Sequence, residues 1–157
     1  MKITELIKPA WIRTRLVAES PAAVIDLLTA ALAEAGMVKA SYAQAVKERE
    51  AVFPTGLPTA GIKVALPHAS AEHVHRSAIA VGTLANPVAF HVMGSPEERV
   101  AVQIVFLLAI AEPKHQAEAL AQLVGIVQQE EVLSGILDAA DGEAVCRLIA
   151  LAAAGQG

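Results

Sequence analysis

The stretch GIKVALPHAS, residues 61–70, places a histidine directly after a run of apolar residues. Apolar side chains alternate with others from Ile62 to Leu66, which is the two-residue period of a β-strand. Pro67 cannot donate a backbone hydrogen bond and fixes its own φ, so the strand is expected to end there. We therefore expect His68 at the mouth of a strand and half exposed. An imidazole has a reference pKa of about 6.5, so an oriented, accessible ring is a good nucleophile near neutral pH.

Two further histidines, His73 and His75, follow closely and make a metal site the first alternative. Together with His68 and the carboxylate of Glu72, they offer ligands for a metal-dependent hydrolase. Zinc sites usually combine ligand clusters at recurrent spacings, and the sequence has neither a recognisable second cluster nor an H-E-x-x-H motif. We therefore expect no metal and no organic cofactor, with His73 and His75 in a solvated loop.

Length and composition predict a single α/β domain with a substantial core. The 157 residues are 55% hydrophobic and 18% charged, which excludes a disordered chain. The net charge of −4 and the lack of a basic run argue against a nucleic-acid partner. No segment approaches the roughly 20 apolar residues of a membrane helix, so no stable membrane insertion is expected. The N-terminal residues lack the apolar core of a signal peptide and Cys146 is the only cysteine, so we expect a cytoplasmic protein without disulfides.

The periodicity of the sequence indicates strands in the middle and helices at both ends. Strands are predicted over residues 11–17, 62–66, 78–84, 88–92 and 100–109. Helices are predicted from Ser20-Pro21 to Gly36, from Ser41 to before Pro54, and in three stretches from Pro113 onward, including residues 132–137 and 141–153. His91 alternates with Phe90 along a strand, which indicates a surface position. This order of elements predicts a mixed β-sheet between helices.

The stretch Arg49–Ser70, REAVFPTGLPTAGIKVALPHAS, resembles the phosphorylated domain of the fructose–mannitol class of enzyme IIA. These are the sugar-specific IIA components of the bacterial phosphoenolpyruvate-dependent phosphotransferase system. The family's Arg-Glu pair, Pro-Thr-Gly loop and Pro-His strand end occur in the same order, as Arg49-Glu50, Pro54-Thr55-Gly56 and Pro67-His68. With His75 and Ser77-Ala78-Ile79 following, the pattern looks closest to galactitol-type IIA proteins.

The resemblance implies a fold, a reaction and two protein partners. The fold would be the three-layer α/β/α, mannitol/fructose IIA-like arrangement, with residues 1–157 forming one IIA (type 2) domain. His68 would accept a phosphoryl group from phosphorylated HPr and pass it to the cysteine of a IIB component, a phosphotransferase activity in sugar or polyol uptake, with galactitol as one candidate. A regulatory IIA-like domain that signals through His68 phosphorylation is the main alternative.

Phosphoryl transfer needs positioning and charge stabilisation, and the other residues of the motif are expected to supply them. The planar guanidinium of Arg49 is suited to phosphate oxygens, although an ordinary ion pair on a helix surface is an alternative. Thr55 and the backbone N–H groups around Gly56 are expected to add donors. Ser70 is expected to bond either the far ring nitrogen of His68 or the backbone of its own loop.

The sequence departs from the family at a second active-site histidine. Many relatives have this histidine four residues before a leucine at the start of the helix that follows the central strand. Counting back four from Leu120 reaches Gln116 and not His115. One residue is about 100° of helix, so the two side chains cannot point the same way. We expect Gln116 to face the site, with His115 as the alternative if the helix begins one residue later, or as a solvated residue at the start of the helix.

Overall fold

The structure, a computed structural model, describes residues 2–155. Its strands are β1 (Ile12–Leu16), β2 (Gly56–Leu57), β3 (Lys63–Ala65), β4 (Ala78–Val92) and β5 (Ser95–Ala109). Its α-helices are α1 (Pro21–Glu34), α2 (Tyr42–Val52), α3 (Pro113–Val127), α4 (Glu130–Asp138) and α5 (Gly142–Ala154), and its 3-10 turns are η1 (Ile3–Glu5), η2 (Pro9–Trp11) and η3 (Ala71–His73). No helix within this described part is long and apolar enough to cross a lipid bilayer.

Residues at the helix ends behave as their types predict. The side-chain oxygen of Ser20 accepts the N–H of Ala23 at 3.1 Å and so caps α1. Asp141 caps α5 in the same way by accepting the N–H of Ala144 at 3.0 Å. Gly36 follows the end of α1 with φ 72, a left-handed conformation that other residues adopt at a cost.

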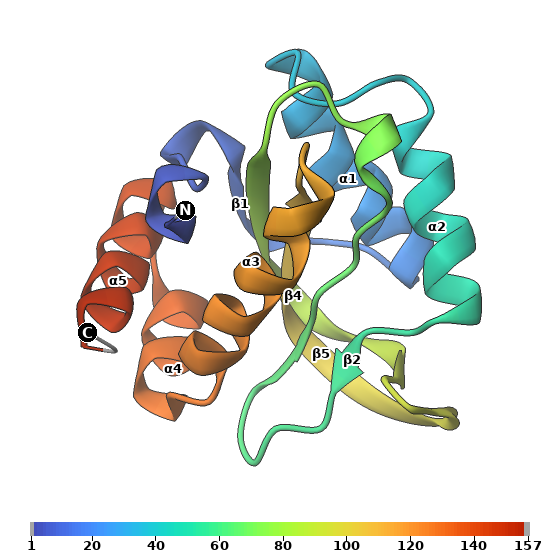
Figure 1. Cartoon of the computed structure of the whole chain (residues 1–157). Helices are drawn as coiled ribbons and strands as arrows, with labels where there is room; N and C mark the ends of the chain where they lie inside the picture. The colour runs from blue at the N-terminus through green and yellow to red at the C-terminus, as the bar shows by residue number, and fades with distance from the viewer. Residues whose placement is uncertain (1, 156–157) are drawn as a thin grey trace.

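The sheet is mixed, and a long hairpin forms its centre. Strands β4 and β5 pair antiparallel over most of their length, joined by a tight turn in which Gly94 has φ 79. On one side β1 runs parallel to β4, and on the other β3 runs parallel to β5. The short β2 pairs antiparallel with β3 and also reaches β4 through Gly56 and Val92. Figure 1 shows the hairpin extending below the helices.

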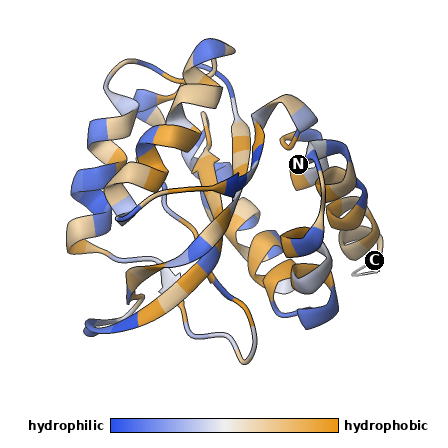
Figure 2. Cartoon of the chain, turned by 180° about the vertical axis from the view of Figure 1, so that it is seen from behind, coloured by the Kyte–Doolittle hydropathy of each residue, from blue (hydrophilic) through white to orange (hydrophobic). Residues whose placement is uncertain are grey.

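Helices cover both faces of the sheet, which confirms the predicted three-layer fold. Helices α1 and α2 lie on one face, and α3, α4 and α5 on the other (Figure 1). Side chains along β5 alternate between the two cores, with Ile104, Phe106 and Leu108 in one and Val105 and Leu107 in the other. In Figure 2 the hairpin changes from hydrophilic at its free end to hydrophobic between the helices.

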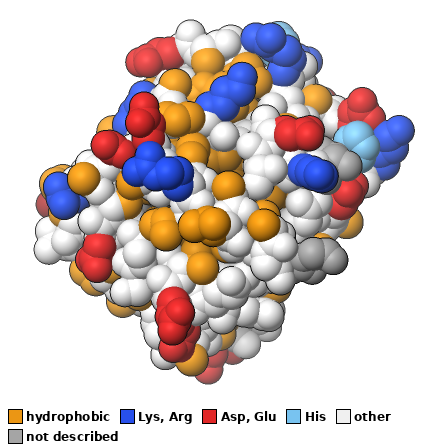
Figure 3. All heavy atoms as spheres, turned by 90° about the vertical axis from the view of Figure 1, so that its left-hand side faces the viewer, with side chains coloured by type: hydrophobic (Ala, Val, Ile, Leu, Met, Phe, Trp, Pro, Cys, Tyr) orange, Lys and Arg blue, Asp and Glu red, His pale blue; other side chains and the backbone are white. Residues whose placement is uncertain are grey.

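The face on which α5 lies is a mixed surface. Figure 3 shows acidic and basic side chains there around smaller apolar areas. Leu151 of α5 is exposed, with 71% of its surface accessible. Cys146 is partly buried on the same helix, and its Sγ lies 4.0 Å from the carbonyl oxygen of Ile7.

Two predicted strand boundaries were wrong, that of β4 because of a proline and that of β5 because its first residues are polar and mostly exposed. Residues 78–84 and 88–92, predicted as two strands, belong to the single strand β4, and β5 begins at Ser95, before the predicted residue 100. The break in the sequence pattern comes from Asn86-Pro87, which is exposed where the pairing of β4 with β5 is irregular, between Thr83 and Val88. A proline removes one ladder hydrogen bond and can sit at such an irregularity without ending the strand.

Candidate functional site

Backbone pairing past the end of β3 positions His68. Although Pro67 ends the strand, its carbonyl accepts the N–H of Leu108 at 3.0 Å, and His68 forms a parallel bridge with Leu108. The carbonyl of Leu108 in turn accepts the hydroxyl of Tyr42, a buried residue of α2, at 2.5 Å. Burial raises the pKa of Tyr42, so this phenol stays protonated and remains a donor. The end of β5 is thus held by hydrogen bonds on both sides of Leu108.

The expectation that His68 is half exposed was wrong. Only 9% of its surface is accessible, because the chain continues beside β5 after Pro67 and does not turn away from the sheet. The neighbouring Leu66 and Ala69 are also buried. The ring is therefore at the edge of the core, and it reaches solvent by a small opening.

A hydrogen bond to the backbone determines which nitrogen of His68 carries the proton. Nδ1 lies 2.9 Å from the carbonyl oxygen of Leu66, and a carbonyl can only accept, so Nδ1 is the protonated nitrogen. Burial lowers the pKa of His68, and the positive charge of Arg49 lowers it further, against the opposing effect of the Leu66 carbonyl. The neutral ring then has its lone pair on Nε2, which is the form an imidazole needs to act as a nucleophile.

Three segments of the chain enclose a hollow of about 270 Å³ beside this ring. The lining comes from α2, from the loop after β3 and from the first turn of α3, and consists of Arg49, His68, Ala69, Ser70, Ala71, Pro113 and Gln116. Arg49 is exposed, and its guanidinium lies 5.2 Å from the centre of the Phe53 ring. A cation over an aromatic face is favourable, so Phe53 helps to hold the guanidinium beside the hollow.

The structure places Gln116 in the hollow, as predicted from the helix register. Helix α3 begins with Pro113 in its first turn, so Gln116 projects toward the lining that includes His68 and Arg49. His115 is one residue earlier, and its Nδ1 lies 3.9 Å from a carboxylate oxygen of Glu112. About a third of the His115 side chain is exposed. The α3 side chain that lines the hollow beside Pro113 is therefore a neutral amide.

Thr55 lies in the interior and not in the hollow, so its expected role as a direct phosphate donor is corrected. Its surface is 2% accessible, and its hydroxyl donates to Oε1 of Glu50 at 2.8 Å while accepting the N–H of Leu66 at 3.1 Å. The backbone N–H of Thr55 donates to the other Glu50 oxygen, also at 2.8 Å. Thr55 is connected to the His68 ring only through Leu66, whose N–H it accepts and whose carbonyl oxygen lies 2.9 Å from Nδ1 of His68.

Ser70 has a different partner from either one expected for it. Its hydroxyl donates to a carboxylate oxygen of Glu72 at 3.1 Å, whereas Nδ1 of His68 is bonded to the carbonyl oxygen of Leu66. Ser70 nevertheless lines the hollow. His73 accepts or donates a 2.8 Å bond with Ser41, and its ring lies 3.6 Å from Glu72. Among residues 2–155, no group of three or more histidine, cysteine and acidic side chains is arranged to hold a metal ion.

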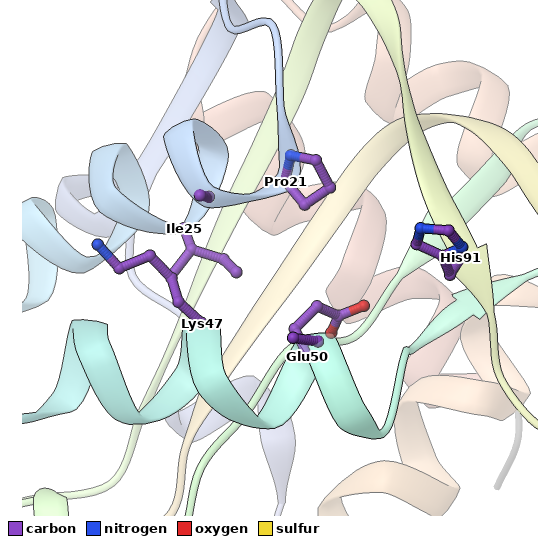
Figure 4. Close-up of a pocket in the computed structure, with 7 residues that line it drawn as sticks. Pro21, Ile25, Lys47, Glu50 and His91 are labelled. Carbon is purple, nitrogen blue, oxygen red and sulfur yellow. The ribbon is translucent and has the colours of Figure 1, made fainter. Parts of the chain in front are cut away.

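Sequence reasoning named Glu50 only as part of the motif and missed what it does. Its carboxylate is 8% accessible, and burial raises its pKa to about 7 in spite of the two Thr55 donors and the charge of Arg49, which lower it. Figure 4 shows Glu50 on α2, bordering a second hollow together with Pro21, Ile25, Lys47 and His91. The polarity of Glu50 next to Arg49 indicated an exposed ion pair, so only the three-dimensional structure reveals this burial.

The comparisons with known proteins agree with this arrangement. The family model for the phosphoenolpyruvate-dependent sugar phosphotransferase system, EIIA 2, matches residues 5–151. The chain belongs to this family. Members of the EIIA 2 family are phosphotransferases that carry phosphoryl groups in sugar uptake. The resemblance seen in residues 49–70 is thereby confirmed.

Two curated relatives and one solved structure indicate the range of the family. The chain is 33% identical over 102 residues to the galactitol-specific EIIA component of Escherichia coli, covering 65% of this chain and 67% of the relative. It is 30% identical over 154 residues to the fructose-specific EIIABC component of Bacillus subtilis, covering 95% of this chain but only 23% of that protein's length. Its fold matches one chain in the complex of IIAMTL and phosphorylated IIBMTL from Escherichia coli, with a TM-score of 0.74 and 19% identity. The match covers 92% of this chain and 96% of that one.

The opposite pKa shifts of Glu50 and His68 predict a measurable pH dependence of stability. The raised pKa of Glu50 makes its contribution to stability fall as pH rises from 4.5 to about 7. The lowered pKa of His68 makes its contribution to stability rise as pH approaches 6.5 and stay level above that value. The two therefore oppose each other in the wild type. We expect the free energy of unfolding of E50Q to rise more steeply with pH between about 5 and 7, by roughly 2 kcal/mol, and that of H68Q to fall.

Urea unfolding at several pH values in this range measures both slopes. E48Q, an exposed change on the same helix, is the matched control for the loss of one carboxylate. A wild-type slope in E50Q would show that the burial of Glu50 does not raise its pKa.

Proposed function

We propose that His68 is the phosphoryl carrier of this protein, receiving the group from phosphorylated HPr and delivering it to the cysteine of a IIB component. In the first step the Nε2 lone pair attacks phosphorus, the new N–P bond forms, and the donor's P–N bond breaks with its electron pair returning to the donor imidazole. In the second step the cysteine thiolate attacks the same phosphorus and an S–P bond forms. The N–P bond to His68 breaks, and its electron pair returns to Nε2. The proton on Nδ1 stays in place throughout.

The observation that carries this proposal is the fixed tautomer of His68 beside an open hollow. The Leu66 carbonyl at 2.9 Å keeps the proton on Nδ1, and burial favours the neutral ring, so Nε2 is ready to attack without losing a proton first. A hollow of about 270 Å³ leaves room for a phosphoryl group next to the ring. The comparisons support the reaction class, since the family carries phosphoryl groups.

Groups around the hollow can offset the charge of the phosphoryl group. Arg49 offers a planar set of donors, and the Gln116 amide can donate one hydrogen bond to a phosphate oxygen. The hollow also lies at the N-terminal end of α3, where the partial positive charge of a helix favours an anion. Ser70 is a further hydroxyl in the lining, within reach once its bond to Glu72 is released.

An apolar surface next to Arg49 fits a transient protein partner. Val52 and Phe53, at the end of α2, are 65% and 61% accessible. They line a shallow depression of about 350 Å³ together with Arg49, Ser70 and His73, and this depression shares Arg49 and Ser70 with the His68 hollow. Small exposed apolar areas of this kind commonly mark docking surfaces. The solved complex of IIAMTL with phosphorylated IIBMTL supports IIB as one of the partners.

The proposed substrate class is a sugar or polyol taken up by a phosphotransferase system, with galactitol as one candidate because a galactitol-specific EIIA component is similar. The alternative is a regulatory domain in which phosphorylation of His68 is the signal. The two differ in the second step, since a transport component passes its phosphoryl group rapidly to a IIB cysteine.

The proposal predicts that incubation with phosphoenolpyruvate, enzyme I and HPr adds one acid-labile, base-stable phosphate on Nε2 of His68. H68Q keeps a side chain of similar size but has no nucleophilic nitrogen, so labelling should be lost. H75Q, an exposed histidine that lines neither the hollow nor the depression, is the matched control and should label like the wild type. Mass spectrometry of the intact protein measures the added phosphate, and full labelling of a folded H68Q protein would exclude His68 as the acceptor.

For Arg49 we expect a loss of transfer rate without a comparable loss of stability. Lysine keeps the charge but not the planar pair of donors, so R49K should slow phosphoryl transfer from HPr by about ten- to a hundredfold. Its free energy of unfolding should change by less than about 0.5 kcal/mol, because the side chain is exposed. R99K, on the exposed part of β5, is the control. Equal transfer rates in R49K and R99K would show that Arg49 has no special role in transfer.

The register of α3 predicts different effects for two adjacent substitutions. Q116A removes an amide from the hollow and should slow transfer from phosphorylated HPr by about tenfold, the loss of one hydrogen bond to a charged phosphate oxygen. H115A changes a side chain that faces Glu112 and should transfer at the wild-type rate. Rapid-quench measurement of both variants decides the matter. Slow transfer in H115A alone would mean that the imidazole, and not the amide, enters the site.

A further inference from the structure

A continuous chain of hydrogen bonds leads from the interior of α2 to the His68 ring. It begins at the buried carboxylate of Glu50, passes through the Thr55 hydroxyl to the N–H of Leu66, and leaves Leu66 by its carbonyl to reach Nδ1 of His68. Each bond joins residues that are 9% accessible or less. The ring is thus connected to a helix through a side chain that does not line its hollow.

With Glu50 ionised, the direction of every bond in this chain is determined. The two Glu50 oxygens accept from Thr55, one from its backbone N–H and one from its hydroxyl, both at 2.8 Å. A hydroxyl has one proton, so once Thr55 donates it to Glu50 the lone pairs of Oγ1 are left to accept the N–H of Leu66 at 3.1 Å. Glu50 therefore fixes the rotation of the Thr55 hydroxyl and makes it an acceptor toward Leu66.

Leu66 is held at its N–H, its side chain and the following peptide. Thr55 accepts its N–H, its side chain is fully buried in the core, and the carbonyl of the next residue, Pro67, is bonded to Leu108. The sheet alone does not explain the first of these contacts, because the ladder of β2 and β3 ends with the pair Gly56 and Ala65. At the next position the side chain of Thr55 accepts the N–H of Leu66, so this threonine extends the pairing by one residue.

We infer that Thr55, with Glu50 behind it, is a positioning residue for His68: it holds Leu66 so that the Leu66 carbonyl keeps the proton of the ring on Nδ1. This rests on the proposed function only for its consequence, which is that Nε2 stays available for the phosphoryl group. Loss of the Thr55 hydroxyl frees the Leu66 N–H, lets the carbonyl turn, and allows the proton of the neutral ring to move to Nε2.

The decisive experiment compares T55V with T83V. Valine has the shape of threonine but no hydroxyl, and Thr83 is a matched control because it is 1% accessible and its Oγ1 also accepts a backbone N–H, that of Arg15 at 2.9 Å. Both changes remove the side-chain acceptor of one backbone N–H, so both should lower stability, and T55V more so because it also removes a donor to Glu50. T55S keeps the hydroxyl and should restore the behaviour of the wild type.

The readout is the tautomer of His68 in the unphosphorylated protein, from two-bond ¹H–¹⁵N correlation spectra at a pH where the ring is neutral. We expect the Nδ1–H form in the wild type, T83V and T55S, and a mixture of the two tautomers in T55V. Transfer from phosphorylated HPr should then be slower in T55V by about ten- to a hundredfold, and within about twofold of the wild type in T55S and T83V. An unchanged tautomer and rate in T55V, or equal changes in T83V, overturns the inference.

A failure of the proposed function would look different. In that case the wild type would not label on His68, while the tautomer of T55V would still shift. Should T55V not fold, E50Q takes its place, because an amide can accept only one of the two Thr55 bonds. A folded E50Q with the wild-type tautomer and transfer rate would equally overturn the inference.

Discussion

The parallel pairing of β3 with β5, continued beyond Pro67 to His68 and Leu108, is the constraint on which the site depends. Parallel strands end at the same edge of a sheet, so the chain leaving β3 and the chain leaving β5 emerge together. The first carries His68, and the second passes directly into α3 with Gln116 in its first turn. A hydrogen bond from Ala111 to Ser77 at 2.8 Å holds that connection. The order of the strands therefore brings His68 and Gln116 together, and helix α2, which packs on one face of the sheet, adds Arg49.

Burial affects the two ionisable groups of this region in opposite directions, and both effects favour the neutral form. The imidazole loses affinity for a second proton, whereas the carboxyl of Glu50 retains its proton to a higher pH. The donors from Thr55 and the charge of Arg49 work against the effect on Glu50, and they are the reason an ionised carboxylate can exist there. In the proposed reaction, a ring that is already neutral, with its proton fixed on Nδ1, can attack through Nε2 without a general base. This agrees with a lining in which the residue facing the ring is an amide.

Much of this architecture was predictable, because apolar periodicity and caps are local signals. The strand before Pro67, the capped starts of α1 and α5 and the two helical layers follow from such signals, whereas the direction of Gln116 follows from the family's histidine pattern together with the helix period. The burial of His68, of Thr55 and of the Glu50 carboxylate could not be predicted in this way, because each depends on a contact between distant segments. A Pro-His pair looks like a strand end in the sequence, and only the bridge to Leu108 reveals that the chain stays on the sheet. Likewise, the polarity of Thr55 gives no sign that its partners are a helix carboxylate and a strand N–H.

An exposed guanidinium beside a buried ring implies that charge stabilisation here changes when a partner binds. In water, the attraction between Arg49 and a phosphoryl group is weak, about 1 kcal/mol at 4 Å, and the stacking on Phe53 serves mainly to keep the guanidinium in place. A protein docked on Val52 and Phe53 removes water from this rim, and the same charges then interact several times more strongly. Because Gln116 adds no positive charge, this dependence falls on Arg49 and on the N-terminal end of α3. If His68 carries the phosphoryl group as proposed, its stabilisation is consequently greatest while the donor or acceptor protein is bound, which is when transfer would take place.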